Sequence, residues 1–363
     1  MATVMTGLEA NLAIFRGEDP GRVLFQPRFN FWHIVNKKRG TMPPHLADIG
    51  YIELHDYCHA SVRYSGGSLR HSVAGVETER EWLDDKRLRI TTHTPVGTLT
   101  ELMHYDAWNQ SSFNTEFRIK TVDDLKILEW MLAHETWGWD DEAFQRSQAE
   151  VAGRGAPQFY YRRSPLQGLF IEHMGFEATI MLMHDEPKAV EHYLAAAAEA
   201  DEALYDVLCA CPVEILNFGE NIDAHMDPPT LWRQYLAPYY TKRLDQLHAA
   251  GKKAHIHIDG AMKPLLNEIR NVPFDGVEAA TPLPQGDVTL EQIKDALGDM
   301  VLLDGIPAIY FMPTFDEDTL IECVKRIVDL FYPRLVLGIS DEIPPDGDIE
   351  RVRLVGELVK DLV

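Results

Sequence analysis

The chain has 363 residues, of which 45% are hydrophobic, so it can bury a large core and is not expected to be disordered. Its formal net charge of −23 would repel a phosphate backbone, which argues against nucleic acid as a partner. It has neither a run of 18 apolar residues nor a secretory leader pattern, so we expect a cytoplasmic protein without membrane contact.

The N-terminal half shows short and irregular apolar patterns. A strand is predicted near Val23–Phe31 and a helix near Leu46–Arg63. Alternating segments at Leu69–Thr78 and Leu88–Leu102 indicate strands, and Pro95-Val96-Gly97 is typical of a hairpin turn. Further along, we predict a strand at Leu166–Ile171 and three helices, at Val122–His134, Asp141–Val151 and Pro187–Cys209.

The C-terminal half alternates short apolar runs with helical patterns. The predicted strands are Val213–Phe218, Ala254–Ile258, Gly276–Ala279, Val301–Asp304 and Arg334–Ile339. The predicted helices are Pro229–Ala250, Ala261–Arg270, Leu290–Leu297, Glu317–Phe331 and a last helix from about Ile349. Such repeats predict a parallel sheet covered by helices, in either a (β/α)₈ barrel or a doubly wound sheet. No GxGxxG follows the first strand, which disfavours a dinucleotide-binding sheet.

We therefore expect an α/β protein with a (β/α)₈ TIM-barrel fold, formed by residues 1–363 as a single domain. The irregular part, about residues 1–160, would supply the first three strands and a lid-like insertion.

Polar side chains follow or end each of the five predicted C-terminal strands. They are Glu220, the pair His255 and His257 with Asp259 behind them, Glu278, Asp304, and the pair Asp341 and Glu342. Taken singly, an acid could be a helix cap and a histidine could be a satisfied core residue. Five strand ends of this kind together favour an active site, because the carboxyl ends of barrel strands meet at one mouth.

Two segments in this half carry a family resemblance. They are FGENIDAHMDPPTLWRQYLAPYYTKRLDQLHAAGKKAHIHIDG and LGISDEIPPDGDIERV, and RVLFQPRFNFW and TPVGTL match more loosely. From about Asp185 to Val363 the chain resembles the uroporphyrinogen decarboxylase superfamily, nearer its corrinoid-dependent methyltransferase branch. The resemblance implies a barrel more firmly than it implies an activity.

The methyltransferases of this superfamily bind zinc through an HxCG and a GCxIPP motif. Here His257-Ile258-Asp259-Gly260 resembles the first, and the segment from Ser340 to Pro345 resembles the second, with aspartate at both cysteine positions. The resemblance thus implies a divalent metal held by His257, Asp259 and Asp341. Zinc is the first expectation, and Fe²⁺, Mn²⁺ or Co²⁺ also suit imidazole and carboxylate ligands. The alternative is that no metal binds and the acids transfer protons.

The decarboxylases have an RQAGR-like motif and an LGHG motif. Here the corresponding segments read FWHIVNKKRGTMP and LGIS, with Ile339 at the histidine position. Both departures argue against uroporphyrinogen decarboxylation. If the chain were a decarboxylase of an acidic small molecule, Lys37, Lys38 and Arg39 would hold the substrate carboxylates.

The expected function is methyl transfer between a small O- or N-methylated substrate and a corrinoid protein. Glu220, His255 and Glu342 are the candidate catalytic residues, and Arg162, Arg163, Glu278 and Asp304 are candidates for binding the substrate. The alternatives are a decarboxylase of a tetrapyrrole or another acidic molecule, and a non-catalytic corrinoid-binding or scaffold protein. The expected partners are the corrinoid protein and, as a candidate assembly, a second copy in a homodimer.

Overall fold

The computed structural model describes residues 5–362 and contains two compact units. Unit 1 consists of Met1–Gly67, Asp141–Tyr161 and Pro212–Val363. Unit 2 consists of Ser68–Asp140 and Arg162–Cys211.

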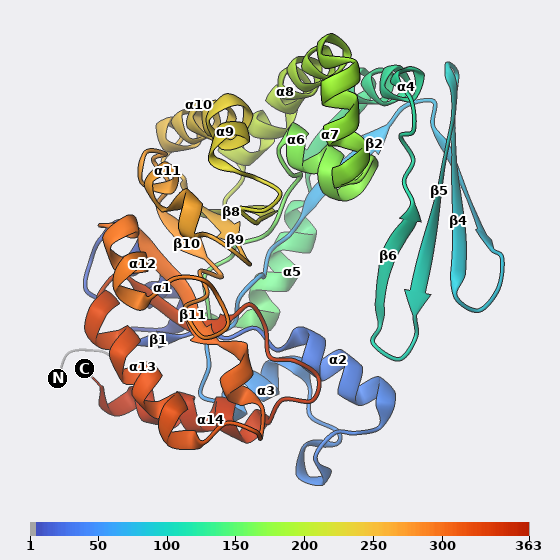
Figure 1. The fold of residues 1–363 in the computed structure, drawn as a ribbon. Helices are drawn as coiled ribbons and strands as arrows, with labels where there is room; N and C mark the ends of the chain where they lie inside the picture. The colour runs from blue at the N-terminus through green and yellow to red at the C-terminus, as the bar shows by residue number, and fades with distance from the viewer. Residues whose placement is uncertain (1–4, 363) are drawn as a thin grey trace. The chain divides into compact units, whose positions relative to one another are not determined.

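Unit 1 is built on a six-stranded parallel sheet whose spatial order is β1-β12-β11-β10-β9-β8 (Figure 1). The strands are β1 (Leu24–Phe25), β8 (Ile215–Ile222), β9 (Lys253–Ile258), β10 (Gly276–Glu278), β11 (Val301–Pro307) and β12 (Leu335–Ser340). Nearly every residue in them is buried, as expected for a sheet covered by helices. The five C-terminal strands predicted from sequence are confirmed.

Two extended segments, near residues 60–65 and 154–160, close this sheet into a ring. The backbone contacts that join them are Ser61 N–H to Phe25 O (2.7 Å), Val62 N–H to Arg154 O (3.2 Å), Gln158 N–H to Ser65 O (3.0 Å), and a parallel bridge between Tyr160 and Asn217. Together with β1 and β8–β12, these two segments make a ring of eight parallel extended segments around one core. The predicted (β/α)₈ barrel is therefore confirmed.

The helices of unit 1 lie on the outside of this ring and at its ends. They are α1 (Gly7–Arg16), α2 (Asn30–Arg39), η1 (Pro44–Leu46), α3 (Tyr51–Tyr57), α5 (Asp141–Val151), α9 (Pro229–Leu231), η3 (Trp232–Leu236), α10 (Ala237–Ala249), η4 (Lys263–Leu265), α11 (Leu266–Arg270), α12 (Leu290–Leu297), η5 (Ala308–Phe311), α13 (Glu317–Phe331), α14 (Ile349–Leu358) and η6 (Val359–Asp361). Thr289 caps α12 and Asp316 caps α13, so both helices begin where the sequence predicts. Helix α1 packs Ile14 and Phe15 against Ile215 and Val301, which begin strands, and so it covers the amino end of the barrel.

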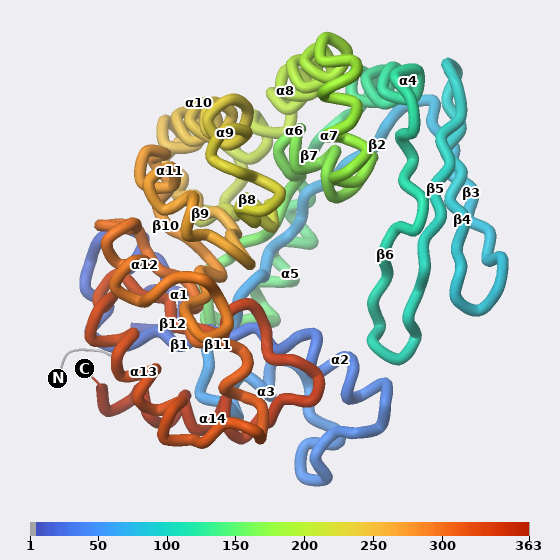
Figure 2. Tube along the Cα trace, in the orientation of Figure 1, coloured from blue at the N-terminus to red at the C-terminus, as the bar shows by residue number. Residues whose placement is uncertain are grey.

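Unit 2 combines antiparallel strands with a small helical core. Strands β3 (Glu77–Trp82), β4 (Arg87–Thr94), β5 (Gly97–Asp106) and β6 (Ser111–Glu116) form a meander, and β2 (Leu69–Val73) pairs with β7 (Glu135–Trp139) (Figure 2). The helices are α4 (Val122–Ala133), α6 (Pro165–Gly168), η2 (Leu169–His173), α7 (Phe176–Asp185) and α8 (Pro187–Ala210). The predicted hairpin turn is confirmed, since β4 and β5 pair on either side of Pro95 and Val96.

Three predictions about the N-terminal half are corrected. Leu166–Ile171 is helical rather than a strand: Ser164-Pro165 begins α6, and the apolar residues bury one helical face. The helix predicted to reach Arg63 ends at Tyr57, because His59 adopts a positive φ of 54° and the chain then becomes extended. The first strand is shorter than predicted, because Pro27 follows it and α2 begins at Asn30.

None of the helices within residues 5–362 combines the length and apolarity needed to cross a membrane.

Candidate active site at the mouth of the barrel

Two histidines of β9 point to the same side of the sheet and meet a carboxylate of β10. The Nδ1 atoms of His255 and His257 lie 4.0 and 3.1 Å from Oε2 of Glu278. All three side chains are buried. Residues two apart on a strand share a face, so the His-x-His spacing of the sequence produces this arrangement directly.

Glu278 also belongs to a buried triad of ion-paired side chains. The Arg63 guanidinium contacts Glu278 Oε1 through Nη1 and Asp304 Oδ1 through Nη2, both at 2.8 Å. The Asn217 amide donates a further hydrogen bond of 2.5 Å to Glu278. Burial raises the pKa of Glu278, and the positive charges of Arg28 and Arg63 oppose that change. Glu278 and Asp304, predicted to bind substrate, are thus held by side chains of the barrel itself.

The tightness of the triad follows from a glycine on the neighbouring strand. A Cβ atom at Gly338 would lie 2.4 Å from Asp304 Oδ1, so only glycine leaves room for this carboxylate. The triad therefore depends on β12 as well as on β10 and β11.

Next to these side chains, two tyrosines and an arginine form a hydrogen-bonded group. Arg28 Nη1 donates to the Tyr160 hydroxyl at 2.8 Å, and the hydroxyls of Tyr160 and Tyr64 lie 2.9 Å apart. The two rings stack with their centroids 4.6 Å apart. Tyr160 is 40% exposed, so a molecule entering the mouth can reach it. Burial of its hydroxyl raises the pKa of Tyr160 to about 12, and the phenol stays protonated at neutral pH.

The three residues that resemble metal ligands do come together. His257 Nε2 lies 3.7 Å from Asp259 Oδ2 and 3.8 Å from Asp341 Oδ1. Burial lowers the pKa of His257, which keeps its ring neutral. Burial acts to raise the pKa of Asp259, but the His257 ring and the hydrogen bond from the Asn221 amide together outweigh it, and the net pKa is lowered.

Their contacts do not fit a bound divalent ion. The Asp341 carboxylate is ion-paired with the Arg28 guanidinium, whose Nε also donates to the Asp341 carbonyl at 3.0 Å. A metal ion on the same carboxylate would stand beside a fixed positive charge. Within residues 5–362, no group of three or more His, Cys, Asp and Glu side chains is arranged to hold a metal.

A family model described as Uroporphyrinogen decarboxylase (URO-D) matches residues 168–362, which is more than half of the chain. The chain belongs to the uroporphyrinogen decarboxylase family. The resemblance inferred from sequence is therefore confirmed.

Two of the solved structures that resemble this chain have names that refer to methyl transfer or methionine synthesis. A methyltransferase from Methanosarcina mazei is 12% identical, with a TM-score of 0.61, over 98% of this chain and 99% of that chain. A B12-independent methionine synthase from Shewanella sp. W3-18-1 is 11% identical, with a TM-score of 0.44, over 93% of this chain and 96% of that chain. Curated proteins gave no match. At 12% identity the likeness to the Methanosarcina mazei methyltransferase shows the fold alone.

The other predicted site residues of this family member lie in different surroundings. Glu220 is fully buried on β8. His255 lies inside the barrel, with Nε2 3.2 Å from Gln158 Oε1, and burial holds its pKa well below the usual value. Glu342 accepts a hydrogen bond of 2.6 Å from the Phe31 N–H at the start of α2, and burial raises its pKa. Arg162 and Arg163 belong to unit 2 and line a cavity there.

Arg28 and Arg63 are the site residues that sequence reasoning missed. Arg63 follows Ala60-Ser61-Val62, a buried segment too short and too mixed to indicate a strand, and Arg28 comes three residues after the two-residue strand β1. The available signal was a cation within three residues of a short stretch that contains apolar residues. Both residues were hidden because the N-terminal strands are much shorter than those of the C-terminal half.

Proposed function

We propose that this chain is an enzyme that moves a methyl group between a small O- or N-methylated substrate and a corrinoid protein. The supporting observation is that the His257–Asp259 pair, Arg28 and the Tyr160 hydroxyl lie together at the carboxyl ends of the barrel strands, with the ring centres of Tyr160 and His257 6.2 Å apart. In this fold the reacting groups occupy that end.

Methyl transfer from oxygen breaks a carbon–oxygen bond and leaves the electron pair on the oxygen. The corrinoid carried by the partner supplies the nucleophile that receives the methyl group. The leaving oxygen needs a proton or a hydrogen-bond donor as its negative charge develops. The barrel mouth provides both kinds of group.

Tyr160 is the proposed donor to that oxygen. Its pKa of about 12 keeps the proton in place until charge develops, and the Arg28 guanidinium 2.8 Å away stabilises a partly negative phenol oxygen. Burial lowers the pKa of His257 and keeps its ring neutral, with Nε2 3.7 Å from the Asp259 carboxylate, so it can deliver or accept a proton. No step of this proposal uses a metal, because Arg28 engages the Asp341 carboxylate.

The proposal can be tested with purified protein and free cob(I)alamin as the methyl acceptor. Aryl methyl ethers and methylamines are offered in turn, and corrinoid methylation is followed by absorbance. We expect turnover with at least one substrate class, and a loss of about 100-fold or more in Tyr160→Phe and His257→Ala.

Tyr332→Phe is the matched control, because Tyr332 precedes β12 and so lies at the amino end of the barrel, where its hydroxyl contacts Asp19. Its activity should equal that of the wild type. Carbon dioxide release from uroporphyrinogen, without corrinoid methylation from any substrate, would overturn the proposal.

Zinc binding provides a second measurement. Removing the guanidinium in Arg28→Ala frees the Asp341 carboxylate beside His257 and Asp259, and we expect zinc affinity to rise at least tenfold by equilibrium dialysis. The gain should disappear in Arg28→Ala/Asp341→Asn. Stoichiometric zinc in the wild type, lost in His257→Ala, would show instead that Arg28 yields to the metal.

A further inference from the structure

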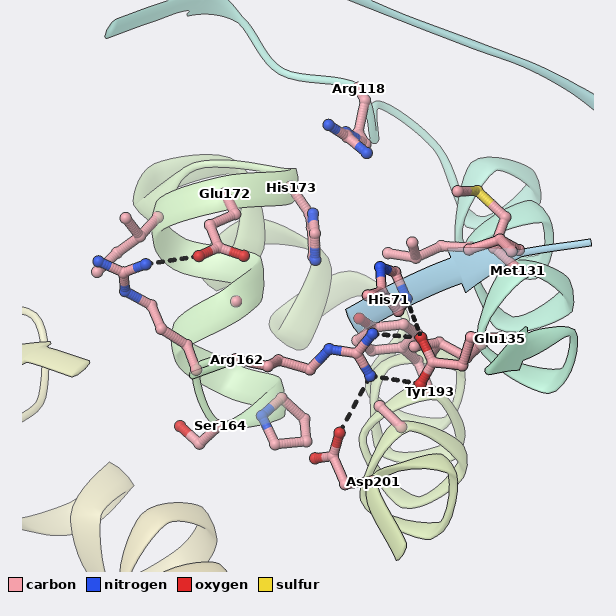
Figure 3. A pocket seen from close by; sticks show the side chains of 18 of the residues that line it. His71, Arg118, Met131, Glu135, Arg162, Ser164, Glu172, His173, Tyr193 and Asp201 are labelled. Atoms are coloured by element: carbon pink, nitrogen blue, oxygen red, sulfur yellow. Dashed lines mark hydrogen bonds and ion pairs between the residues drawn. The ribbon is translucent and has the colours of Figure 1, made fainter. Parts of the chain in front are cut away.

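Unit 2 contains a cavity of about 580 Å³ that is lined by residues of that unit. Its walls come from strands β2, β4, β5, β6 and β7, from helices α4, α6 and α8, and from η2 (Figure 3). A volume of this size suits a small organic molecule. The charged groups in its wall indicate which kind.

Three arginines line the cavity, and each is paired with a carboxylate. Arg118 Nη2 donates to Glu101 at 2.6 Å and Arg163 Nη1 to Glu172 at 2.5 Å, while Arg162 Nη1 lies 2.6 Å from Glu135 and 3.1 Å from Asp201. These pairs fix the guanidinium groups in position before any ligand arrives.

The two sides of these pairs are not equally accessible. The side chains of Arg118 and Arg162 are 26% and 23% exposed, whereas Glu101, Glu135 and Asp201 are 6%, 3% and 1% exposed. At Arg118 and Arg162 the carboxylates thus lie behind the guanidinium groups, whereas in the third pair Glu172 is 38% exposed and Arg163 is 23% exposed. What this part of the cavity presents to a ligand is positive charge and N–H donors.

His173 adds a polar group without a partner. Its Nδ1 is shielded from solvent and makes no hydrogen bond with any described residue. Figure 3 shows the ring reaching from η2 into the space between Arg118 and Arg162. Burial, helped by the charges of Arg118 and Arg162, lowers the pKa of His173 to about 3, so the ring is neutral. An unmade hydrogen bond at a buried polar atom costs about 1–3 kcal/mol, which a ligand atom would recover.

Another part of the wall is apolar. Leu128, Met131 and Leu132 of α4 contribute to it, together with Tyr193 and Ala197 of α8. Below them the Arg162 guanidinium lies 4.9 Å from the ring centre of Trp137. A ligand that fills the cavity must therefore have an apolar body next to its polar group.

We propose that this cavity binds a small organic carboxylate with an apolar body. The carboxylate lies between Arg118, Arg162 and His173, and the body lies against α4 and α8. A singly charged acid suits the site better than a phosphate dianion, because the lining holds three arginines and four carboxylates. This inference rests on unit 2 alone and is independent of methyl transfer.

The test compares 4-phenylbutyrate with its neutral amide, 4-phenylbutyramide, as probes in calorimetric titrations of the full chain. The two probes have the same apolar body and differ only in charge. We expect the acid to bind at least tenfold more tightly than the amide. Equal affinity for the two probes would overturn the proposal, because it would show that only the apolar wall contributes.

The decisive variant is Arg118→Gln/Glu101→Gln, which removes both charges of a buried pair and leaves no unpaired acid. We expect its affinity for 4-phenylbutyrate to fall at least tenfold, while the thermal midpoint stays close to that of the wild type. Arg89→Gln is the matched control, because Arg89 is an exposed arginine of β4 that pairs with Glu81. Unchanged binding in the double variant would refute the assigned carboxylate position, whatever the methyl-transfer assay shows.

Discussion

The stability of the barrel interior depends on the buried positive charge of Arg63. It is buried between Glu278 and Asp304, and neither carboxylate reaches solvent. A buried ion pair adds little stability by itself, since desolvation offsets the attraction. Removing one partner is costly, because the remaining charges stay buried without compensation.

We therefore expect Arg63→Met to lose about 3–5 kcal/mol of unfolding free energy, measured by urea denaturation. Arg16→Met is the control, because Arg16 pairs with Glu214 at the surface, where an ion pair contributes about 0–1 kcal/mol. Equal losses in the two variants would show that the triad is hydrated or protonated rather than ionic.

His55 makes the stability of unit 1 depend on pH. The ring is fully buried and packs against Phe29 in a tilted arrangement with centroids 4.3 Å apart, and its Nδ1 lies 2.9 Å from the Tyr51 carbonyl oxygen. Burial lowers its pKa from 6.5 to about 4. The folded state thus binds the proton less readily than the unfolded state.

Because the folded pKa is depressed, the contribution of His55 is complete above about pH 6.5 and is lost as the pH falls toward 4. The loss amounts to about 3 kcal/mol at most. In His55→Gln, which does not titrate, the plot of unfolding free energy against pH should be shallower over this range. A slope identical to that of the wild type would mean that the ring stays accessible to protons in the folded protein.

At the scale of elements, the barrel is closed by its least regular parts. The segments near residues 60–65 and 154–160 join β1 to β8 through a few backbone hydrogen bonds. Their close approach depends on Gly155, where a Cβ atom would lie 1.9 Å from the Val62 carbonyl oxygen. A side chain at Gly155 must push the two closing segments of the barrel apart.

We expect Gly155→Ala to destabilise the protein by about 1–3 kcal/mol, as overpacking of a tight contact does. Gly138→Ala is the matched control, because a Cβ atom at Gly138 in β7 meets nothing within 4 Å. Chemical denaturation of both variants measures the difference. Equal losses of unfolding free energy in the two variants would show that the two closing segments move apart at little energetic cost.

The difference between the regular C-terminal strands and the two closing segments explains which parts of the barrel could be predicted from the sequence. Strands β8 to β12 are buried and separated by helices, two of them with side-chain caps, so their apolar runs predict the barrel. In that barrel His257, Asp259 and Asp341 come together. The closing segments have no such run, so Arg63 was assigned to a helix. The apolar run at Leu166–Ile171 suited either structure, and only the Ser-Pro start favoured a helix. Pairings such as Arg28 with Asp341 join distant positions and leave no local pattern.

At the scale of the whole molecule, each unit has a core of its own. In unit 1, Ile215 packs with residues of α1, β11 and β12. In unit 2, Leu125 packs with residues of α8 and of β5. Both side chains are almost completely buried. Parts of a chain that bury separate cores can unfold in separate steps.

Scanning calorimetry should therefore resolve two unfolding transitions. Ile215→Ala and Leu125→Ala each remove a buried aliphatic side chain, which costs about 2–5 kcal/mol. We expect the first substitution to lower the midpoint of one transition by several degrees and the second to lower that of the other, because each cavity weakens only the core that contains it. A single transition that both substitutions shift equally would show instead that the two cores unfold as one cooperative body.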